Sequence, residues 1–339
     1  MKQTVLSLMA GVALVATAGV AQATTLEDVV ARGTLNCGVN AAGLIGFASA
    51  DDQGNWTGFD VDYCKAVAAA VFGDASKVSY VPLTATERFT ALQSGTIDML
   101  ARNTTWTMDR DTKQGLLFAG VNYYDGQGFM VRKDLNVAST LELEGASICV
   151  QTGTTNELNL ADYVNLHELG ASSVVFERQE EADAAYDAGR CDAYTTDASG
   201  LYSIRLKLTA PDDHMVLPEI ISKEPLGPVV RQGDDQWFNI VKWVHYALLN
   251  AEELEITQAN VEQMMSSEDQ NVRRLLGVDG EFGAGAGLSN DWAVQAIKAV
   301  GNYGESFERN VGSGSPLQIA RGLNALWNNG GIQYAPPVR

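Results

Sequence analysis

An arginine and an aspartate, 87 residues apart, each follow a short apolar segment that predicts a strand. Arg110 ends the polar run 103–110, which follows the apolar segment 96–100, and Asp197 ends the segment 192–197. The planar guanidinium of arginine makes two parallel charge-assisted hydrogen bonds to one carboxylate. An aspartate offers the complementary charge for an ammonium group. Such a fixed cation and anion in paired loops indicate a receptor for a zwitterion, and an amino acid is the expected ligand.

Strands and helices alternate in the part of the chain that leads to Arg110. The pattern predicts strands at 35–39, 78–81 and 96–100, a helix with an apolar stripe over 61–71, and a helix from about Thr86 to Gly95. Asp60 is a good N-cap for the first helix. Strands that alternate with helices of this length predict βαβ units and parallel sheets.

The same order returns after residue 145. It predicts strands at 146–150, 174–176 and 191–195, a polar turn at 151–156 that leads into a helix, and a helix over 180–188. Shifted by 94 residues, the segment 91–98 overlays 185–192, so that Gly95 matches Gly189 and Asp98 matches Asp192. Asn103 then falls on Asp197, which predicts two similar lobes with the two charged loops in equivalent places.

Polar side chains cluster where these predicted strands end. They are Asn40, the run 103–110 with Thr105, the turn 151–156 with Thr155 and Asn156, and Asp197. Ligands of open parallel α/β sheets bind beyond the carboxyl ends of the strands. Two lobes that present these ends to one another would enclose a cleft.

The amino terminus predicts a secretory signal peptide over residues 1–23. Lys2 is followed by the apolar run 5–20 and by an Ala-Gln-Ala cleavage site at 21–23. We therefore expect a mature chain that starts at Thr24 and is exported to the periplasm. No later stretch reaches the roughly 20 apolar residues of a membrane span.

Length and charge restrict the class of protein. Loss of Lys2 with the leader lowers the net charge from −19 to −20. A chain this acidic repels phosphate backbones and anionic lipid, so nucleic-acid and membrane partners are not expected. The 316 residues that remain are too many for one core and favour two lobes.

Four cysteines occur without the close spacing of a zinc site. In an oxidising compartment an even number favours disulfides, and four cysteines allow three pairings. We predict Cys37–Cys64 and Cys149–Cys191, because each pair falls within one group of strands and helices. Buried free thiols are the alternative.

Three segments resemble motifs of the type II periplasmic amino-acid-binding proteins of ABC transporters. They are Gly-Phe-Asp-Val-Asp at 58–62, Leu-Gln-Ser-Gly-Thr-Ile-Asp at 92–98 and Gly-Thr-Thr-Asn-Glu at 153–157. The resemblance covers about 35–250. The longer carboxyl end is similar to the subgroup that serves glutamate, glutamine, aspartate and asparagine or L-amino acids in general.

The resemblance implies a role for each polar residue of the cleft. Arg110 would bind the ligand's α-carboxylate, helped by the hydroxyl and amide of Thr105 and by the amide of Thr155 at a helix N-terminus. Asp197 would bind the α-ammonium group, with the carbonyl of Asn103 as a second acceptor.

Two further positions bear on the ligand's side chain. Arg88 matches a position that contacts the side-chain carboxylate in acidic-amino-acid binders. Asn40 stands where such binders carry another arginine. Because an amide both donates and accepts, Asn40 extends the expected range from Glu and Asp to Gln and Asn.

The implied fold has two lobes with mainly parallel sheets. We predict that lobe 1 comprises 24–125 and 226–339 and that lobe 2 comprises 126–225. The carboxyl-terminal extension is expected to be helical near 255–276, 290–300 and 316–327.

The expected function is capture of an L-amino acid by a monomer that delivers it to an ABC permease in the inner membrane, without metal or cofactor. Two alternatives stay open: a periplasmic enzyme of the same fold, such as a dehydratase, and a binding module that reports to a sensor. The histidines His167, His214 and His245 lie in no Ser or Cys motif, which argues against catalysis.

Overall fold

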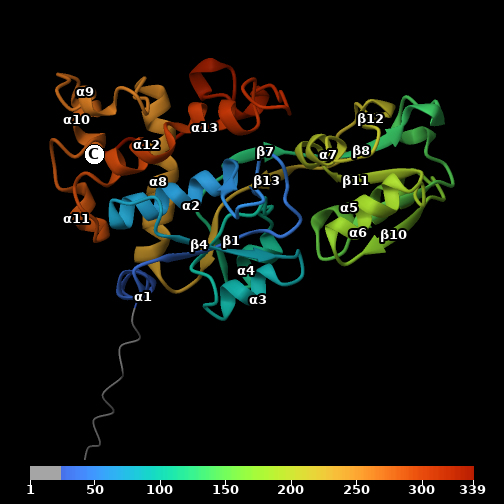
Figure 1. The fold of residues 1–339 in the computed structure, drawn as a ribbon, viewed down its shortest axis with the longest axis horizontal. Helices are drawn as coiled ribbons and strands as arrows, with labels where there is room; N and C mark the ends of the chain where they lie inside the picture. Colours follow the sequence, from blue (N-terminus) through green and yellow to red (C-terminus); the bar gives the residue numbers. More distant parts are fainter. Residues whose placement is uncertain (1–23) are drawn as a thin grey trace, which may run out of the picture.

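The computed structural model describes residues 24–339, and the predicted signal peptide lies outside them. The strands form two separate five-stranded sheets (Figure 1). The first sheet has the order β4 (Val78–Leu83), β1 (Leu35–Asn40), β5 (Met99–Leu100), β14 (Val229–Arg231) and β6 (Leu116–Phe118). In this sheet β1 pairs in parallel with β4 and β5, and β14 is antiparallel to β5 and β6.

The second sheet repeats this arrangement. Its order is β10 (Ser172–Phe176), β9 (Ser147–Gln151), β11 (Ala193–Asp197), β8 (Gln127–Arg132) and β12 (His214–Val216). Here β9 is parallel to β10 and β11, whereas β8 is antiparallel to β11 and β12. Only the fourth strand in each order runs against the others, so the expectation of mainly parallel sheets is confirmed.

The predicted 94-residue correspondence holds in three dimensions. β5 and β11 are the central strands of their sheets. Asp98 accepts a hydrogen bond from the N–H of Asn36 at 2.7 Å, and Asp192 accepts one from the N–H of Ser147 at 2.8 Å. Each aspartate therefore ties the start of the central strand to the start of its neighbour.

The chain passes between the sheets twice. Strand β7 (Tyr123–Asp125) leaves the first sheet, and β13 (Glu224–Leu226) returns to it. The two pair in antiparallel fashion, with Glu224 opposite Asp125. Figure 1 shows this ribbon between the two sheets.

Helices cover both sheets. Around the first lie α1 (Thr25–Arg32), α2 (Phe59–Phe72), α3 (Arg88–Gln93), α4 (Met108–Lys113) and the small hairpin of β2 (Ser49–Ala50) and β3 (Trp56–Thr57). Around the second lie α5 (Thr155–Leu166), α6 (Gln179–Asp187) and α7 (Ala198–Arg205).

The start of α2 differs from the prediction. The helix begins at Phe59, after Gly58, so Asp60 is not its N-cap. Gly58 has φ 133°, and a Cβ there would lie 2.2 Å from the carbonyl oxygen of Phe47. The close approach of these two backbone segments requires glycine. Asp60 instead accepts the N–H of Asn103 at 2.9 Å.

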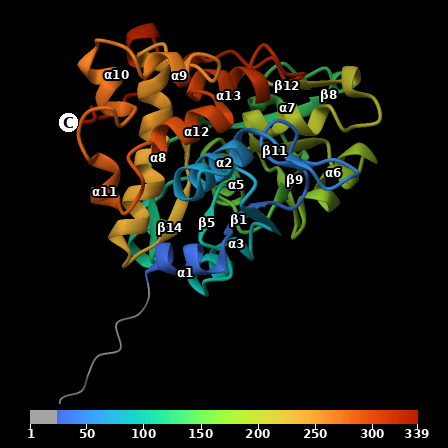
Figure 2. The same cartoon turned by 60° about the vertical axis from the view of Figure 1, so that its left-hand side comes forward.

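The carboxyl-terminal part of the chain is helical and packs against α2 (Figure 2). Its elements are α8 (Asp235–Glu253), α9 (Val261–Met264), α10 (Gln270–Leu275), α11 (Phe282–Ala286), α12 (Trp292–Val300) and α13 (Tyr303–Asn310). A capping box of Asn302 and Glu305 starts α13, and the carboxylate of Asp62 in α2 accepts hydrogen bonds from Ser306 and Asn310, each at 2.7 Å.

The helix expected at 316–327 was wrong. This stretch holds only 3-10 turns, at Gly322–Asn324 and from Trp327. Gln318 and Gly322 have φ values of 49° and 48°, which interrupt a right-handed helix. The predicted helix at 255–276 is likewise two short helices, α9 and α10, which a turn separates. Glu255, at the start of the predicted range, has φ 57° and lies outside both.

Both predicted disulfides are present. Cys37–Cys64 joins β1 to α2, and Cys149–Cys191 joins β9 to the residues before β11, with sulfur–sulfur distances of 2.12 and 1.97 Å. In residues 24–339 no helix has the length and apolar character needed to cross a bilayer.

Candidate functional site

Arg110 lies in α4, where the hydroxyl of Thr107 caps the helix by accepting the Arg110 N–H. The side chain is buried rather than solvated. Its Nη1 donates to the carbonyl of Thr105 at 2.8 Å, and its guanidinium carbon lies 5.1 Å from the centre of the Phe89 ring. The contacts hold one nitrogen and one face of the guanidinium, so the rest of the fork is free to bind a carboxylate.

Arg88 is also buried, with 3% exposure, and its guanidinium carbon lies 4.7 Å from the centre of the same Phe89 ring. Its terminal nitrogens make long contacts of 3.5 Å to the hydroxyl of Thr104 and to the carbonyl of Gly153. Its Nε has no hydrogen-bond partner among residues 24–339. Arg88 therefore carries hydrogen-bonding capacity that the described part of the chain does not use.

Asp197 ends β11 and is 4% exposed. One of its oxygens accepts a hydrogen bond from Nδ2 of Asn156 at 3.0 Å, and Asn156 is itself held by Gln127, which donates to its carbonyl at 3.0 Å. Asp197 makes no side-chain cap for α7, although it occupies the capping position. The carboxylate is held toward Asn156 and is not committed to its own helix.

Thr105 and Thr155 meet with their hydroxyl oxygens 3.3 Å apart. Thr105 follows β5 of the first sheet, and Thr155 is the first residue of α5, which follows β9 of the second. Both hydroxyls donate to the buried carboxylate of Glu224 in β13, at 2.6 and 2.8 Å.

Asn103 and Asn40 lie at the ends of strands of the first sheet, Asn103 after β5 and Asn40 as the last residue of β1. Asn103 has φ 31°, a value that asparagine tolerates better than most side chains, and its buried Oδ1 has no partner among residues 24–339. Asn40 donates to Oε1 of Gln179 at 3.3 Å, at the first residue of α6. The Nε2 of Gln179 is a further buried donor without a partner in the described chain.

Six of the eight polar residues that the sequence singled out contact one another or a shared neighbour: Thr105 contacts Thr155, Asn156 contacts Asp197, and Arg88 and Arg110 both lie against the Phe89 ring. Within residues 24–339, Asn40 and Asn103 form no hydrogen bond with these six.

The structure adds three more polar residues: Arg102, Gln179 and Glu224. Arg102 lies two residues after β5, and Gln179 begins α6 three residues after β10, so their position just beyond a strand was the signal that could have revealed them. Glu224 is the first residue of β13, and nothing in its local sequence marks it.

Burial shapes the electrostatics of the arginines. It lowers the pKa of Arg88 well below its usual value, and the positive charges of Arg110 and Arg102 act in the same direction. Burial also lowers the pKa of Arg102, to about 10, and that of Arg110, where the negative charges of Glu224 and Asp197 oppose the shift. A ligand carboxylate would relieve this concentration of positive charge.

The carboxyl groups show the opposite effect. Burial raises the pKa of Asp197 well above its usual value, and the charges of Asp125 and Glu224 add to it. Burial likewise raises the pKa of Asp125 to about 6, against hydrogen bonds from Ser199 and the N–H of Gly126. An ammonium group beside Asp197 would favour its ionised form.

Several contacts join elements of the two sheets directly. They are Asn40 to Gln179, Arg88 to Gly153, Thr105 to Thr155, and Lys207 Nζ to the carbonyl of Ala42 at 3.3 Å. The described structure is therefore a closed arrangement, in which the ends of both sheets meet.

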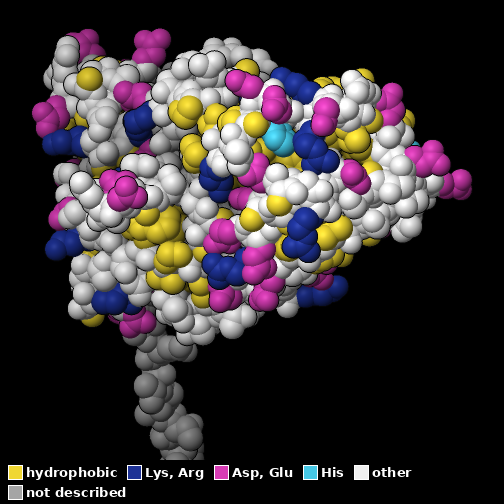
Figure 3. All heavy atoms as spheres, turned by 45° about the vertical axis from the view of Figure 1, so that its right-hand side comes forward, with side chains coloured by type: hydrophobic (Ala, Val, Ile, Leu, Met, Phe, Trp, Pro, Cys, Tyr) yellow, Lys and Arg dark blue, Asp and Glu magenta, His cyan; other side chains and the backbone are white. Residues whose placement is uncertain are grey.

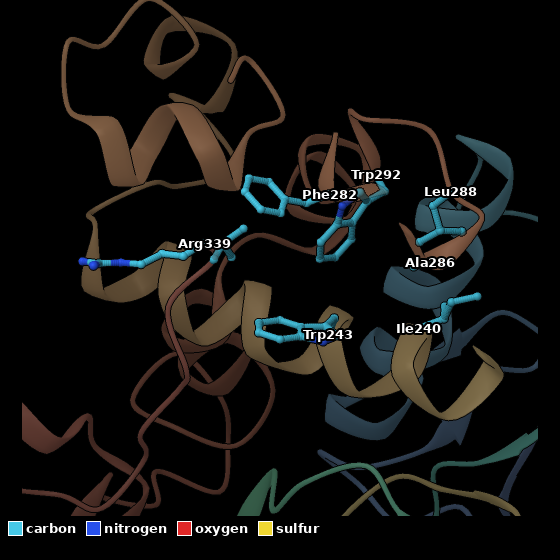
Figure 4. Close-up of a pocket in the computed structure, with 8 residues that line it drawn as sticks. Ile240, Trp243, Phe282, Ala286, Leu288, Trp292 and Arg339 are labelled. Carbon is cyan, nitrogen blue, oxygen red and sulfur yellow. The ribbon is translucent and has the colours of Figure 1, made fainter. Parts of the chain in front are cut away.

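A separate cavity of about 180 Å³ lies among α8, α11, α12 and the carboxyl terminus (Figure 4). Trp243, Phe282 and Trp292 surround it, and the guanidinium of Arg339 points away from these rings. Its lining is mainly apolar and includes none of the cleft residues. On the face that Figure 3 shows, acidic and basic side chains are interspersed. Residues 24–339 contain no group of three or more side chains placed to hold a metal ion.

Relatives of known name resemble the chain over its full length. It is 66% identical to the general L-amino acid-binding periplasmic protein AapJ of Rhizobium johnstonii, over 100% of both chains. It is 57% identical to the glutamate/glutamine/aspartate/asparagine-binding protein BztA of Rhodobacter capsulatus, over 95% of both.

Solved structures agree with the fold. An ABC transporter periplasmic binding protein from Brucella ovis, with glutathione bound, is 63% identical and superposes with a TM-score of 0.92, over 94% of this chain and 100% of that one. The two-lobed type II fold is therefore established. The family model for bacterial extracellular solute-binding proteins, family 3, matches residues 35–260, and the chain belongs to that family.

Proposed function

We propose that this protein captures L-amino acids in the cleft between its two sheets and delivers them to an ABC permease from the periplasm. The observation that supports the proposal is that Arg110 and Asp197 are both buried, follow strands of different sheets, and lie near enough for the charge of Asp197 to oppose the lowering of the pKa of Arg110. The names of the relatives, which are binding proteins rather than enzymes, support the same reading.

The α-carboxylate of the ligand would bind to Arg110 and to two main-chain N–H groups. Thr155 is the first residue of α5, so its N–H has no acceptor within the helix. Helix N-termini favour anions for this reason. Asp197 would bind the α-ammonium group, with the carbonyl of Asn103 beside it. Two charge-assisted interactions with opposite signs select a zwitterion.

The side chain of the ligand would lie toward Arg88, Asn40 and Gln179. Arg88 Nε and Gln179 Nε2 are buried donors with no partner among residues 24–339. Donors suit a terminal carboxylate or a terminal amide oxygen equally. The amides of Asn40 and Gln179 can turn to accept from an NH2 group, so we propose a broad range that favours Glu, Gln, Asp and Asn.

Ligand exchange requires the cleft to open. We propose that residues 24–125 with 226–339 form one lobe, that 126–225 form the other, and that the β7–β13 ribbon is the hinge between them. A ligand that contacts both lobes favours the closed form through these differential contacts. The closed monomer would then dock on the permease.

Replacing Arg110 by alanine tests the proposal. Isothermal titration should show L-glutamine binding to the unaltered protein, with a dissociation constant on the order of micromolar, or about −8 kcal/mol. Arg110→Ala should abolish binding of every L-amino acid, whereas Arg190→Ala, an exposed arginine on the second sheet's side, should leave it unchanged. Near-native affinity in Arg110→Ala would remove this residue from the site.

The bound glutathione of the Brucella ovis protein points to a second ligand. Glutathione ends in a γ-glutamyl group whose α-ammonium and α-carboxylate are free, the same pair of charges that Asp197 and Arg110 would bind. We therefore propose that glutathione competes with L-glutamine for this cleft. When glutathione is titrated into protein saturated with L-glutamine, the apparent affinity for glutathione should be lower than in protein without L-glutamine.

A further inference from the structure

Glu224 in β13 is a buried carboxylate, 1% exposed, whose oxygens each accept two hydrogen bonds. Oε2 accepts from the hydroxyls of Thr105 and Thr155 at 2.6 and 2.8 Å. Oε1 accepts from the hydroxyl of Ser222 at 2.6 Å and from Nδ2 of Asn159 at 2.8 Å. An ionised carboxylate has about four lone-pair sites, so these four neutral donors satisfy it completely.

The donors come from three different parts of the molecule. Thr105 follows the central strand of the first sheet, whereas Thr155 and Asn159 belong to α5 beside the second sheet. Glu224 itself lies in one of the two strands that pass between the sheets. One carboxylate therefore links both sides of the cleft to the ribbon that joins them.

These bonds determine which groups remain for the ligand. Because both threonine hydroxyls donate to Glu224, neither can donate to a ligand carboxylate at the same time. The backbone around Thr105 bonds to β13 through Trp106 N–H to Pro225, at 2.8 Å, and through Gly227 N–H to Thr104, at 3.1 Å.

Thr105 consequently faces Leu226 as a non-hydrogen-bonded pair. In such a pair the N–H of each residue points away from the partner strand. The Thr105 N–H thus points away from β13, and the Thr155 N–H lies free at the start of α5.

We propose that Glu224 is a positioning residue of the amino-acid site, an inference that rests on the proposed function. It holds the hydroxyls of Thr105 and Thr155 together, so that their main-chain N–H groups are fixed for the α-carboxylate and the closed form is stabilised over the open one. Glu224 acts through the threonines on the α-carboxylate, which all amino acids share. Its effect on affinity is therefore the same for every ligand.

Glu224→Gln tests this role in binding. The amide places an NH2 group where a carboxylate oxygen accepts two donors, so the link between the two sides is broken. We expect the dissociation constants for L-glutamine and L-alanine to rise by the same factor, about tenfold, or about 1.4 kcal/mol. Stopped-flow kinetics should assign the increase to faster dissociation.

Glu252→Gln is the matched control, because Glu252 is a carboxylate of α8 that bonds Arg321 at 3.0 Å in the carboxyl-terminal part of the chain. It should leave both dissociation constants unchanged. Tighter binding by Glu224→Gln would show that the carboxylate competes with the ligand. Three results would overturn the proposal: tighter binding by Glu224→Gln, an unchanged affinity, and an effect on only one of the two ligands.

A ligand-free measurement separates this inference from the proposed function. Fluorescent labels on cysteines introduced at the exposed positions Val30 and Val175 report the separation of the two sheets, since all native cysteines form disulfides. Glu224→Gln should increase this separation without any ligand, and an unchanged separation overturns the role in closure. A protein that binds no amino acid would refute the proposed function alone.

Thr105→Val and Thr155→Val remove the same hydrogen bonds one at a time. If Glu224→Gln does not fold, these two variants carry the test. Each should increase the label separation, and a closed arrangement that persists in both contradicts the proposal.

Discussion

Asp197 illustrates how burial prepares a side chain for a ligand. Its carboxylate lies among other acidic groups, and burial raises its pKa well above the usual value. Holding the ionised form therefore costs free energy until a cation arrives. The same group that destabilises the ligand-free protein would stabilise the complex.

Asp197→Asn should separate these two effects. The amide keeps the shape of the side chain and removes the buried charge, so the free energy of unfolding should be unchanged or higher. Binding should lose roughly 2 kcal/mol or more, because the ligand's ammonium group loses its charged partner. Urea denaturation and titration of L-glutamine measure the two quantities. A variant that binds L-glutamine with unchanged affinity would exclude Asp197 as the ammonium partner.

The raised pKa values also predict how affinity depends on pH. Burial raises the pKa of Asp125 to about 6 and raises that of Asp197 in the same direction. The ammonium group requires ionised Asp197, so binding releases the proton that the ligand-free site holds. Affinity should be constant at pH values above the raised pKa of Asp197 and should fall as the pH drops below it, by at most tenfold per pH unit for each proton.

Titration in buffers of different ionisation enthalpy counts the protons released. Asp197→Asn should reduce the number released. An affinity that stays constant between pH 7.5 and pH 4.5 would contradict the proposed role of the acidic groups.

At the scale of elements, the segment 58–62 shows why a short motif can determine much of the structure. Gly58 allows the close approach to Phe47, Asp60 holds the N–H of Asn103 beside the cleft, and Asp62 bonds α13. Phe59 and Val61 are fully buried between them. The motif thus connects the first sheet, the site and the carboxyl-terminal extension.

The strands and most of the site were predictable because they depend on local patterns. Apolar runs and stop signals located β1, β4, β9 and β10, and the convergence of strand ends predicted that Arg110 and Asp197 lie near one another, which agrees with the effect of the Asp197 charge on Arg110. The helix at 316–327 was wrong, because positive φ angles at Gln318 and Gly322 leave no clear trace in an apolar pattern. Glu224 was missed because its partners come from segments up to 119 residues away.

Removing the second disulfide tests how strongly these elements depend on one another. Cys149 and Cys191 close a loop of 42 residues, and such a loop corresponds to about 4 kcal/mol in the chain-entropy model. Replacing both by serine should lower the free energy of unfolding by up to this amount. The dissociation constant for L-glutamine should stay within a few-fold of its original value, because neither cysteine lies at the cleft. Equilibrium urea unfolding measures the stability, and a loss of binding in folded protein would contradict this separation.

At the scale of the whole molecule, two sheets of the same strand order are joined only by a narrow ribbon and by contacts across the cleft. The buried apolar side chains form separate clusters for the two parts, with Met130 and Phe129 in those of the second. Apolar contact between the parts includes Tyr202 and Leu206, partly buried side chains beside the second sheet that pack against the cluster of the first. The charged groups of the cleft also contribute to the balance between open and closed forms.

Ligand binding should in consequence stabilise the entire molecule. A ligand bound only by the folded protein adds about 2.7 kcal/mol to the free energy of unfolding when its concentration is 100 times the dissociation constant. In scanning calorimetry, L-glutamine should raise the midpoint of thermal unfolding by a few degrees. The two parts should unfold together at this higher temperature, because the ligand contacts both. Arg110→Ala should show no such increase. D-glutamine should raise the midpoint less than L-glutamine does, because the ammonium group and side chain of the D-enantiomer exchange places when its carboxylate is bound. If L-glutamine stabilised only one part, the ligand would lie on one lobe, and the bridging role of Arg110 and Asp197 would be wrong.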